Sequence, residues 1–239
     1  MQVFFIDLLN SNIDLQAYQS FLSADEKARA NRITSVLAKR NFICGRALIK
    51  TTLAKILNCL AQNVILKATE NGRLEIDSPS SKLHFNISHS NNYIVLAVST
   101  NPVGIDIEYI KNRNYLEIAE YFFTQKEFES LKKIADDIAR PRIFYYYWTT
   151  KEAFIKCNGA TLFDKSFVLE CSIDVPTKII KHNFNQEYQL LTMHLNQDYV
   201  ISIAAKESVF SEEFVEVQQI IDLESGAFAT RKINLVAQS

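Results

Sequence analysis

The sequence predicts an α+β fold built from two similar subdomains, and three observations lead to it. Strand-like and helical segments follow one another in mixed runs rather than in strict β-α-β alternation. The order of strand, helices and strands starts again after Thr100-Asn101-Pro102. The chain has 239 residues, 48% of them hydrophobic, which is enough for one large or two small globular domains. We expect an N-terminal subdomain over residues 1–102, a C-terminal subdomain over 103–222 and a candidate flexible tail over 223–239, without a clear residue-level repeat.

The first half opens with Val3-Phe4-Phe5-Ile6, a short apolar run of strand formers that predicts a buried strand. Ser23-Ala24-Asp25-Glu26 is an S-x-x-E capping box, whose hydroxyl and carboxylate each accept from a backbone N–H at the start of a helix. Apolar residues with a period of about 3.6 predict a longer helix from about Val36. Further strands are expected at residues 64–66, 83–87 and 93–99, with a turn at Asn71-Gly72.

The second half repeats this order of elements. Residues 103–108 predict a strand, and Thr124-Gln125-Lys126-Glu127 is a second capping box. A long helix is expected from about Arg142 to Asn158, with Gly159 as its C-terminal cap. Strands are expected at residues 167–171, 188–193, 199–205 and 214–220.

Composition excludes several classes of protein. With 5 Gly, 4 Pro and no run of 18 apolar residues, the chain is neither disordered, nor collagen-like, nor membrane-spanning. The N-terminus carries Asp7 in its apolar run and lacks the basic region and cleavage site of a signal peptide. We therefore expect a cytoplasmic protein. The four cysteines have no C-x2-C spacing, which argues against a disulfide framework and a structural zinc site.

The segment from Lys27 to Lys55 contains eight basic residues and no acidic one. A field of that sign attracts a phosphate-rich small molecule or a nucleic acid. The plain alternative is a solvated helix face. Because aromatic residues are not interleaved with these cations, nucleic acid is the last choice among the ligands.

Two groups of charged residues suggest chemistry in the second half. Asp106 and Glu108 stand two apart in the predicted strand and project from the same face, and hard oxygen ligands suit Mg²⁺. Trp148, Glu152 and Lys156 are spaced four apart on the predicted helix and line one stripe. Glu152 could be a third carboxylate for the cation, and Lys156 a point charge for a phosphate. Solvated surface charges and an i,i+4 ion pair remain open as alternatives.

Asn86-Ile87-Ser88-His89-Ser90 forms a cluster of small polar residues at the end of an apolar strand. It offers hydroxyl and imidazole donors to an anion, so phosphate contact is the favoured interpretation over a structural histidine. The sequence contains no G-x-x-x-x-G-K-[ST], G-x-G-x-x-G, H-E-x-x-H or G-x-S-x-G motif. P-loop, dinucleotide-binding, zincin and α/β-hydrolase interpretations therefore have no motif support.

Four motifs follow one another along the chain. They are Phe85-Asn86-Ile87-Ser88-His89-Ser90, Val103-Gly104-Ile105-Asp106-Ile107-Glu108, Phe122-Phe123-Thr124-Gln125-Lys126-Glu127, and Trp148-Thr149-Thr150-Lys151-Glu152-Ala153-Phe154-Ile155-Lys156. In this order they resemble the motifs of the long, Sfp-like 4'-phosphopantetheinyl transferases. The resemblance covers about residues 1 to 222 and implies two α+β subdomains related by a pseudo-twofold axis, each a small, mostly antiparallel sheet with a long packed helix. It also implies coenzyme A as co-substrate, Mg²⁺ as cofactor and a carrier protein as acceptor.

Residue by residue, the resemblance implies three metal-binding acids, a lysine near the reacting phosphate, and a set of contacts to coenzyme A. The acids are Asp106, Glu108 and Glu152, the lysine is Lys156, and the contacts are Ser88, His89, Arg29, Arg40, Arg46 and Arg73. Two places depart from the family pattern. Gly72-Arg73-Leu74 stands where the family has G-K-P, which keeps the cation, and Asn158-Gly159-Ala160-Thr161-Leu162 lacks the second glycine of the usual turn.

The resemblance implies transfer of the 4'-phosphopantetheine group from coenzyme A to a serine of an acyl or peptidyl carrier protein, with release of adenosine 3',5'-bisphosphate. Glu152, or Glu108 through water, would be the general base, and Lys156 would assist at the phosphate. The alternatives are a non-catalytic module that binds coenzyme A or a carrier protein, and a Mg²⁺-dependent pyrophosphate hydrolase. We expect a monomer that binds neither nucleic acid nor membrane.

Overall fold

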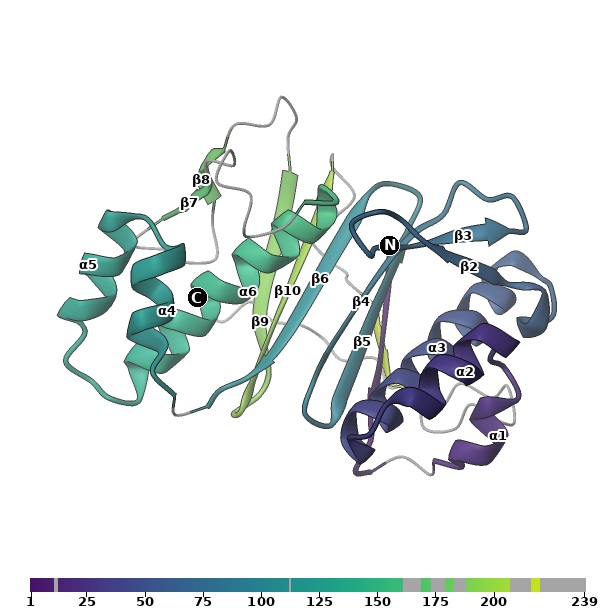
Figure 1. Cartoon of the computed structure of the whole chain (residues 1–239). Coiled ribbons are helices and arrows are strands. Elements are labelled where there is room, and N and C mark those ends of the chain that lie inside the picture. The colour runs from purple at the N-terminus through teal and green to yellow at the C-terminus, as the bar shows by residue number, and fades with distance from the viewer. Residues whose placement is uncertain are drawn as a thin grey trace. The chain divides into compact units, whose positions relative to one another are not determined.

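The computed structural model (Figure 1) describes residues 1–10, 13–111, 113–160, 169–172, 179–182, 188–206 and 216–219. The chain divides into two compact units. The first contains Met1–Thr100 and a strand near the end of the chain, and the second begins at Asn101. Each unit combines a small sheet with packed helices, so the predicted α+β class is confirmed. No helix in the described ranges has the length and apolar character needed to cross a lipid bilayer.

The first unit is a four-stranded sheet with helices packed on one face (Figure 1). Its strand order is β11-β1-β5-β4, in which β11 runs parallel to β1 and the other pairs are antiparallel. A separate hairpin joins β2 and β3. The elements are β1 (Gln2–Asp7), α1 (Leu15–Gln19), α2 (Ala24–Arg32), α3 (Val36–Leu57), η1 (Ala61–Asn63), β2 (Ile65–Ala68), β3 (Leu74–Ser78), β4 (His84–Ser90), β5 (Tyr93–Ser99) and β11 (Glu216–Gln219).

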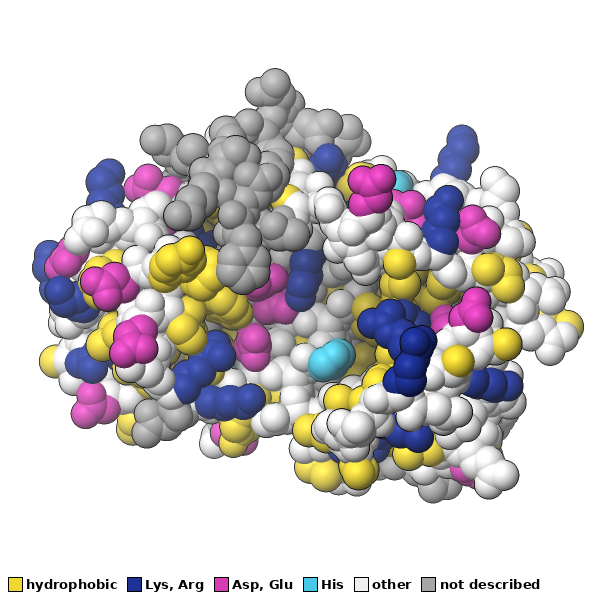
Figure 2. Space-filling model, viewed as in Figure 1, with side chains coloured by type: hydrophobic (Ala, Val, Ile, Leu, Met, Phe, Trp, Pro, Cys, Tyr) yellow, Lys and Arg dark blue, Asp and Glu magenta, His cyan; other side chains and the backbone are white. Residues whose placement is uncertain are grey.

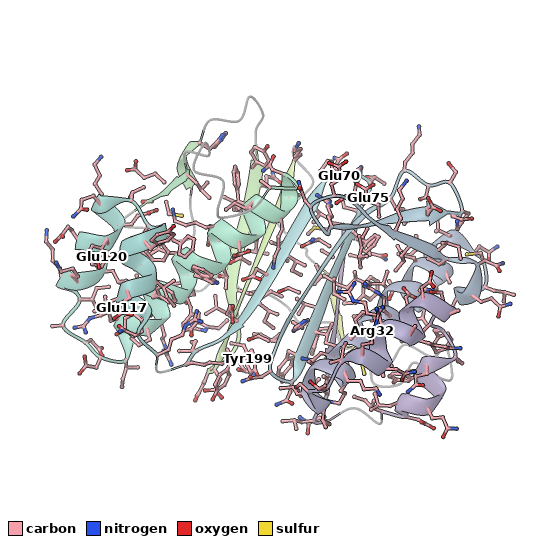
Figure 3. All side chains as sticks on the ribbon, in the orientation of Figure 1. Arg32, Glu70, Glu75, Glu117, Glu120 and Tyr199 are labelled. Atoms are coloured by element: carbon pink, nitrogen blue, oxygen red, sulfur yellow. The ribbon has the colours of Figure 1, made fainter. Side chains whose placement is uncertain are left out.

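The second unit has a three-stranded sheet of order β6-β10-β9 and a two-stranded pair β7-β8. Its helix α4 keeps Ala119 buried and carries Glu117 and Glu120 on its exposed side (Figure 3). The elements are β6 (Val103–Tyr109), α4 (Tyr115–Phe122), α5 (Gln125–Lys133), α6 (Ala139–Cys157), β7 (Leu169–Cys171), β8 (Ile179–His182), β9 (Tyr188–Asn196) and β10 (Tyr199–Lys206).

Most predicted elements are present, with differences in extent. The two long helices are α3 and α6, and α6 begins three residues before the predicted start. The strand β3 was not predicted, because five residues with two acids among them give a weak apolar pattern. Within the strand expected at 167–171, residues 167 and 168 lie outside the described residues, and so does the candidate tail over 223–239.

Both predicted capping boxes are confirmed, and each glutamate also binds a lysine of the following long helix. Glu26 accepts from the backbone N–H of Ser23, and its Oε2 lies 2.8 Å from Lys50 Nζ. Glu127 accepts from Thr124 N–H, and its Oε2 lies 3.0 Å from Lys151 Nζ. In each unit, one glutamate carboxylate therefore caps the N-terminus of a short helix and also forms an ion pair with the long helix that follows.

The helix α6 packs closely on β6 and β10. An added Cβ at Gly104 would overlap the carbonyl oxygen of Ala153 and the backbone nitrogen of Cys157. Because side chains alternate along a strand, Asp106 and Glu108 lie on the same face of β6 as Gly104. The last turns of α6 therefore lie directly over the acidic residues of the strand.

Candidate functional site

The acidic residues of β6 and α6 come together in the second unit, and we call Asp106, Glu108 and Glu152 the acidic cluster. Asp106 is only 4% exposed. Lys156 Nζ lies 2.6 Å from Asp106 Oδ1 and forms an ion pair with it. Since Glu152 and Lys156 are one turn apart on α6, both side chains reach the same part of the strand. The structure thus brings together four residues that the motifs singled out.

Burial and the neighbouring charges of the cluster shift the pKa values of Glu152 and Lys156. Burial raises the pKa of Glu152, Lys156 lowers it, the carboxylates of Asp106 and Glu108 raise it, and the result is a pKa of about 7. Burial lowers the pKa of Lys156, but the carboxylates, Asp106 first among them, more than offset this, and the pKa of Lys156 is raised. Three acids that share one lysine carry an excess of negative charge, which favours a further cation.

The donor set of the cluster suits a divalent cation of the hard type. Its members offer only carboxylate oxygens, which Mg²⁺ prefers. Among the residues that the structure describes, no group of three His, Cys, Asp or Glu side chains already has the arrangement of metal ligands. In this structure the ammonium group of Lys156 is the cation that neutralises Asp106.

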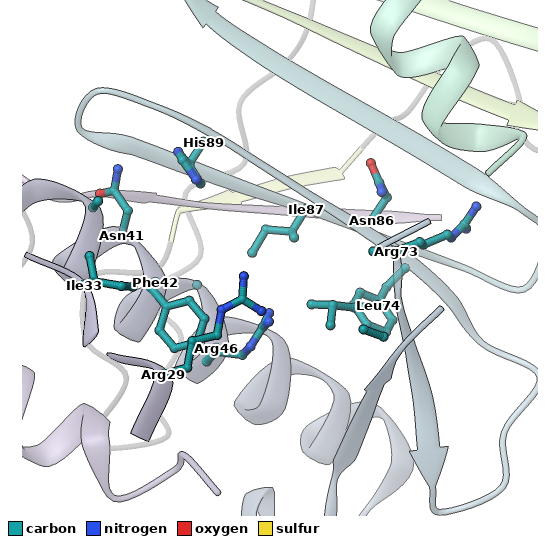
Figure 4. Close-up of a pocket in the computed structure, with 15 residues that line it drawn as sticks. Arg29, Ile33, Asn41, Phe42, Arg46, Arg73, Leu74, Asn86, Ile87 and His89 are labelled. Carbon is teal, nitrogen blue, oxygen red and sulfur yellow. The ribbon is translucent and has the colours of Figure 1, made fainter. Parts of the chain in front are cut away.

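A pocket of about 550 Å³ lies in the first unit, between α2, α3, β4 and the turn between β2 and β3 (Figure 4). Lys and Arg side chains gather on this face of the unit (Figure 2). In Figure 4 the Arg73 side chain extends away from Arg29 and Arg46. The lining includes Arg29, Phe42, Arg46, Arg73, Asn86 and His89.

Two of these arginines lie against one aromatic ring. The guanidinium carbons of Arg29 and Arg46 are 5.3 Å and 4.9 Å from the centre of the Phe42 ring. Burial lowers the pKa of Arg46, Glu26 raises it, and the nearby charge of Arg29 lowers it again. Two guanidinium groups held this close repel each other, so an anion between them is favoured. This pocket is called the arginine pocket below.

Two predicted contacts to coenzyme A lie apart from the arginine pocket. Arg40 donates from Nη2 to Asn92 Oδ1 at 2.7 Å, and it is not one of the described residues that line the pocket. Ser88 is 8% exposed and points to the opposite face of β4 from His89, because adjacent strand residues alternate. Of the six predicted contacts, the pocket therefore contains Arg29, Arg46, Arg73 and His89.

Sequence reasoning missed Phe42 as a lining residue and Glu26 as a partner of the basic residues. The spacing of Phe42 and Arg46, four residues on one helix, was the available signal for the first. Nothing local indicated the second, since Glu26 and Lys50 belong to different helices.

One of the two α+β units carries an arginine pocket and the other an acidic cluster, charges that suit an anionic ligand and a cation respectively. Two sequence models of known protein families match the chain. The sequence model of the 4'-phosphopantetheinyl transferase superfamily matches residues 102–210, and the model of the 4'-phosphopantetheinyl transferase N-terminal region matches residues 10–101.

Curated relatives agree with this match. The 4'-phosphopantetheinyl transferase gsp of Aneurinibacillus migulanus is 30% identical, over 82% of this chain and 77% of that protein. Sfp of Bacillus subtilis is 26% identical over 89% and 95%, and HetI of Nostoc sp. is 36% identical over 61% and 62%. The part of this chain that matches covers 62% of the length of HetI and 60% of the length of a relative from Synechocystis sp..

The chain belongs to the 4'-phosphopantetheinyl transferase family. The family that the four ordered motifs predicted is thereby confirmed.

Proposed function

We propose that this protein transfers the 4'-phosphopantetheine group of coenzyme A to a serine of an acyl or peptidyl carrier protein, with adenosine 3',5'-bisphosphate as the second product. The observation that carries the proposal is the convergence of Asp106, Glu108 and Glu152 around Lys156. Curated relatives are named for the same activity. Phosphoryl transfer is mostly positioning plus electrostatic stabilisation, and this cluster has the charges for both.

In this proposal the acidic cluster would hold Mg²⁺ through Asp106, Glu108 and Glu152. Bound there, Mg²⁺ would neutralise the charge that develops on the diphosphate of coenzyme A. Lys156 would interact with the phosphate of the leaving group as a compact positive charge. The arginine pocket would hold an anionic part of coenzyme A through Arg29 and Arg46, with Arg73 and His89 as further contacts.

The reaction also requires a proton acceptor. The serine oxygen forms a bond to the phosphorus of the pantetheine phosphate, the bond from that phosphorus to the bridging oxygen of the diphosphate breaks, and the serine proton goes to a carboxylate. Glu152 is our choice for that carboxylate, because it lies in the acidic cluster one turn of α6 from Lys156. Its pKa is raised to about 7 without a metal, mainly by burial, and bound Mg²⁺ would lower that pKa. Glu108 acting through water is the second choice.

The test uses the full-length protein with coenzyme A, Mg²⁺ and a panel of apo carrier proteins, followed by mass spectrometry. We expect a carrier that is heavier by one phosphopantetheine group. Unchanged reactants would indicate a binding module. Cleaved coenzyme A beside an unmodified carrier would indicate a pyrophosphate hydrolase. Either result overturns the proposal.

We also propose that the protein acts as a cytoplasmic monomer and does not bind nucleic acid. Both family models match within this one chain, so one copy is sufficient for the proposed activity. Lys50 is only 2% exposed and pairs with Glu26, so part of the basic segment is neutralised within the fold. Mass measurement by light scattering tests the first statement, and salt-dependent DNA binding would contradict the second.

A further inference from the structure

Four hydroxyl side chains, three of them buried and Thr192 partly exposed, form a continuous chain between α6 and the sheet of the second unit. Ser202 Oγ on β10 lies 2.7 Å from Thr149 Oγ1 on α6 and 2.7 Å from Thr192 Oγ1 on β9. Thr192 Oγ1 lies 2.9 Å from Thr150 Oγ1, which returns to α6. Thr149 also donates to the carbonyl oxygen of Tyr145 at 2.8 Å. We call these four residues the hydroxyl chain.

The hydroxyl chain lies next to the acidic cluster. In the antiparallel ladder of β6 and β10, Ser202 is the direct partner of Asp106. Side chains of directly paired residues project from the same face of a sheet, so Ser202 and Asp106 both face α6. On the helix, Thr149 is three residues before Glu152, which is about one turn. The same hydrogen bonds that join α6 to the sheet therefore stand beside two of the three acids.

Hydrophobic packing alone would not place a chain of hydroxyl groups inside a protein. Ser202, Thr149 and Thr150 have no exposed surface. Burying a hydroxyl is unfavourable unless it is hydrogen-bonded, and apolar residues of similar volume would pack there without that requirement. Hydrogen bonds are directional, whereas apolar contacts are not. The chain therefore restricts how α6 can rotate about its own axis.

That restriction matters for the geometry of the acids. Side-chain ends lie about 5–6 Å from a helix axis, so a roll of about 20° would move the carboxylate of Glu152 by about 2 Å. A misplacement of about 1 Å can reduce a rate by about 10²-fold. Apolar packing alone would allow Glu152 and Lys156 to shift relative to Asp106.

We infer that Ser202, with Thr149 and Thr192, is a positioning residue for the acidic cluster: it fixes the rotation of α6 so that Glu152 and Lys156 meet Asp106. This inference rests on the proposed function. The hydroxyls themselves take no part in bond making. Their effect is to hold the carboxylates at the spacing that one divalent cation and one substrate phosphate require.

The test compares Thr149→Val, which removes the hydroxyl at nearly constant volume, with Thr149→Ser, which keeps it. Ser202→Ala removes the central hydroxyl of the chain. For Thr149→Val and Ser202→Ala we expect an increase of about 10-fold in the apparent Mg²⁺ constant and a fall of about 10-fold in kcat, with the KM for coenzyme A within about twofold. Thr149→Ser should stay near wild type.

The matched control is Thr51→Val. Thr51 on α3 donates to the carbonyl oxygen of Ala47 at 2.8 Å, the same local bond that Thr149 makes on α6, but in the other unit. Losing that bond alone should leave kcat and the Mg²⁺ dependence unchanged. An equal loss of activity in Thr51→Val would overturn the inference.

A readout independent of catalysis separates this inference from the proposed function. Mn²⁺ binding, followed by calorimetry or electron paramagnetic resonance, should weaken in Thr149→Val and Ser202→Ala by about the same 10-fold. If wild type binds Mn²⁺ but modifies no carrier, the proposed function fails and the positioning role stands. If the variants unfold more easily yet bind Mn²⁺ and turn over as wild type does, the positioning role fails. Should Ser202→Ala not fold, Thr149→Val and Thr192→Val give the same test.

Discussion

The two units share a framework and differ in the side chains placed on it. In each, a strand is followed by two shorter helices, a long helix, a small hairpin and a pair of strands that joins the first strand. In each, a capping-box glutamate binds a lysine of the long helix. Ser23 and Thr124, Glu26 and Glu127, and Lys50 and Lys151 are each 101 residues apart. A residue-level repeat, which was not predicted, thus exists at the buried framework positions.

The same spacing assigns each site residue a counterpart, and several counterparts differ from it in chemistry. Two of the three acids of the second unit, Asp106 and Glu152, correspond to uncharged residues of the first, and Arg29 and Arg46 correspond to uncharged residues of the second. Asp106 corresponds to Phe5, Glu152 to Thr51, Arg29 to Ser130 and Arg46 to Tyr147. The ion pair between a capping-box glutamate and a lysine is therefore common to both units, whereas the acidic cluster and the arginine pocket are each found in one unit.

The largest effect is expected from Asp106→Ala, which removes a member of the acidic cluster and the partner of Lys156. Transfer should fall by about 10³-fold or more while the fold remains intact by circular dichroism. Asp7→Asn is the matched control on β1. Asp7 is the counterpart of Glu108, but it binds Tyr93 and local backbone groups, so its loss should affect stability only. Activity of Asp106→Ala that returns at saturating Mg²⁺ would refute the proposed role of this residue.

Removal of the framework lysines tests whether the two ion pairs are equivalent. Glu127 has no exposed surface, so Lys151→Met leaves a buried carboxylate without its charge partner and should lower the free energy of unfolding by about 3–5 kcal/mol. Lys50→Met should be less costly, about 1–2 kcal/mol, because Arg46 still lies 3.2 Å from Glu26. Urea unfolding of both variants measures the difference. Equal losses of unfolding free energy in the two variants would mean that Arg46 does not compensate for the loss of Lys50 at Glu26.

The raised pKa of Glu152 predicts a pH dependence specific to the second unit. A carboxyl whose pKa is higher in the folded state binds its proton more tightly there, so it destabilises the fold progressively as pH rises from about 4.5 to about 7. Glu152→Gln should therefore raise the free energy of unfolding at about pH 8, without divalent cations, by about 1–3 kcal/mol. Below about pH 4.5 the two proteins should be equally stable. The opposite sign in chemical unfolding would show that the attraction of Lys156 outweighs burial and the other two acids together.

The smallest effect concerns the arginine pocket. Arg29→Gln should raise the KM for coenzyme A about 10-fold with kcat nearly unchanged, because one charge-assisted contact to a phosphate is lost. Arg40→Gln should change KM by less than about threefold, since Arg40 binds Asn92 away from the pocket lining. Initial-rate kinetics with both variants decide between them. If Arg40→Gln has the larger effect, the ligand does not use the arginine pocket as proposed.

Local signals in the sequence predicted the local structure well. The capping boxes at Ser23 and Thr124 set both helix starts, because the residues that make the bonds are only three apart. The alternation around Asp106 predicted that both strand acids share one face, and in the structure the charges of Asp106 and Glu108 both raise the pKa of Glu152. These features depend on neighbours along the chain, and so they could be read without the fold.

Features that depend on distant partners could not be predicted. The sequence does not show that Lys50 is buried by a glutamate from another helix. Nor does it link Ser202 to Thr149, since that hydrogen bond joins residues from a strand and a helix that are far apart in the chain. The hydroxyl chain is therefore visible only after α6 has been placed on the sheet.

The parallel pairing of β11 with β1 has a consequence for biosynthesis. The strand that pairs with the outer edge of β1 is β11, residues Glu216–Gln219, whereas β1 itself begins at Gln2. A ribosome must therefore translate nearly all of the second unit before the first sheet receives its fourth strand. The first unit is therefore synthesised first but receives its last strand only after the second unit has been made. Until then the edge of β1 has no partner strand, and it is the place where a nascent chain would pair with a wrong strand.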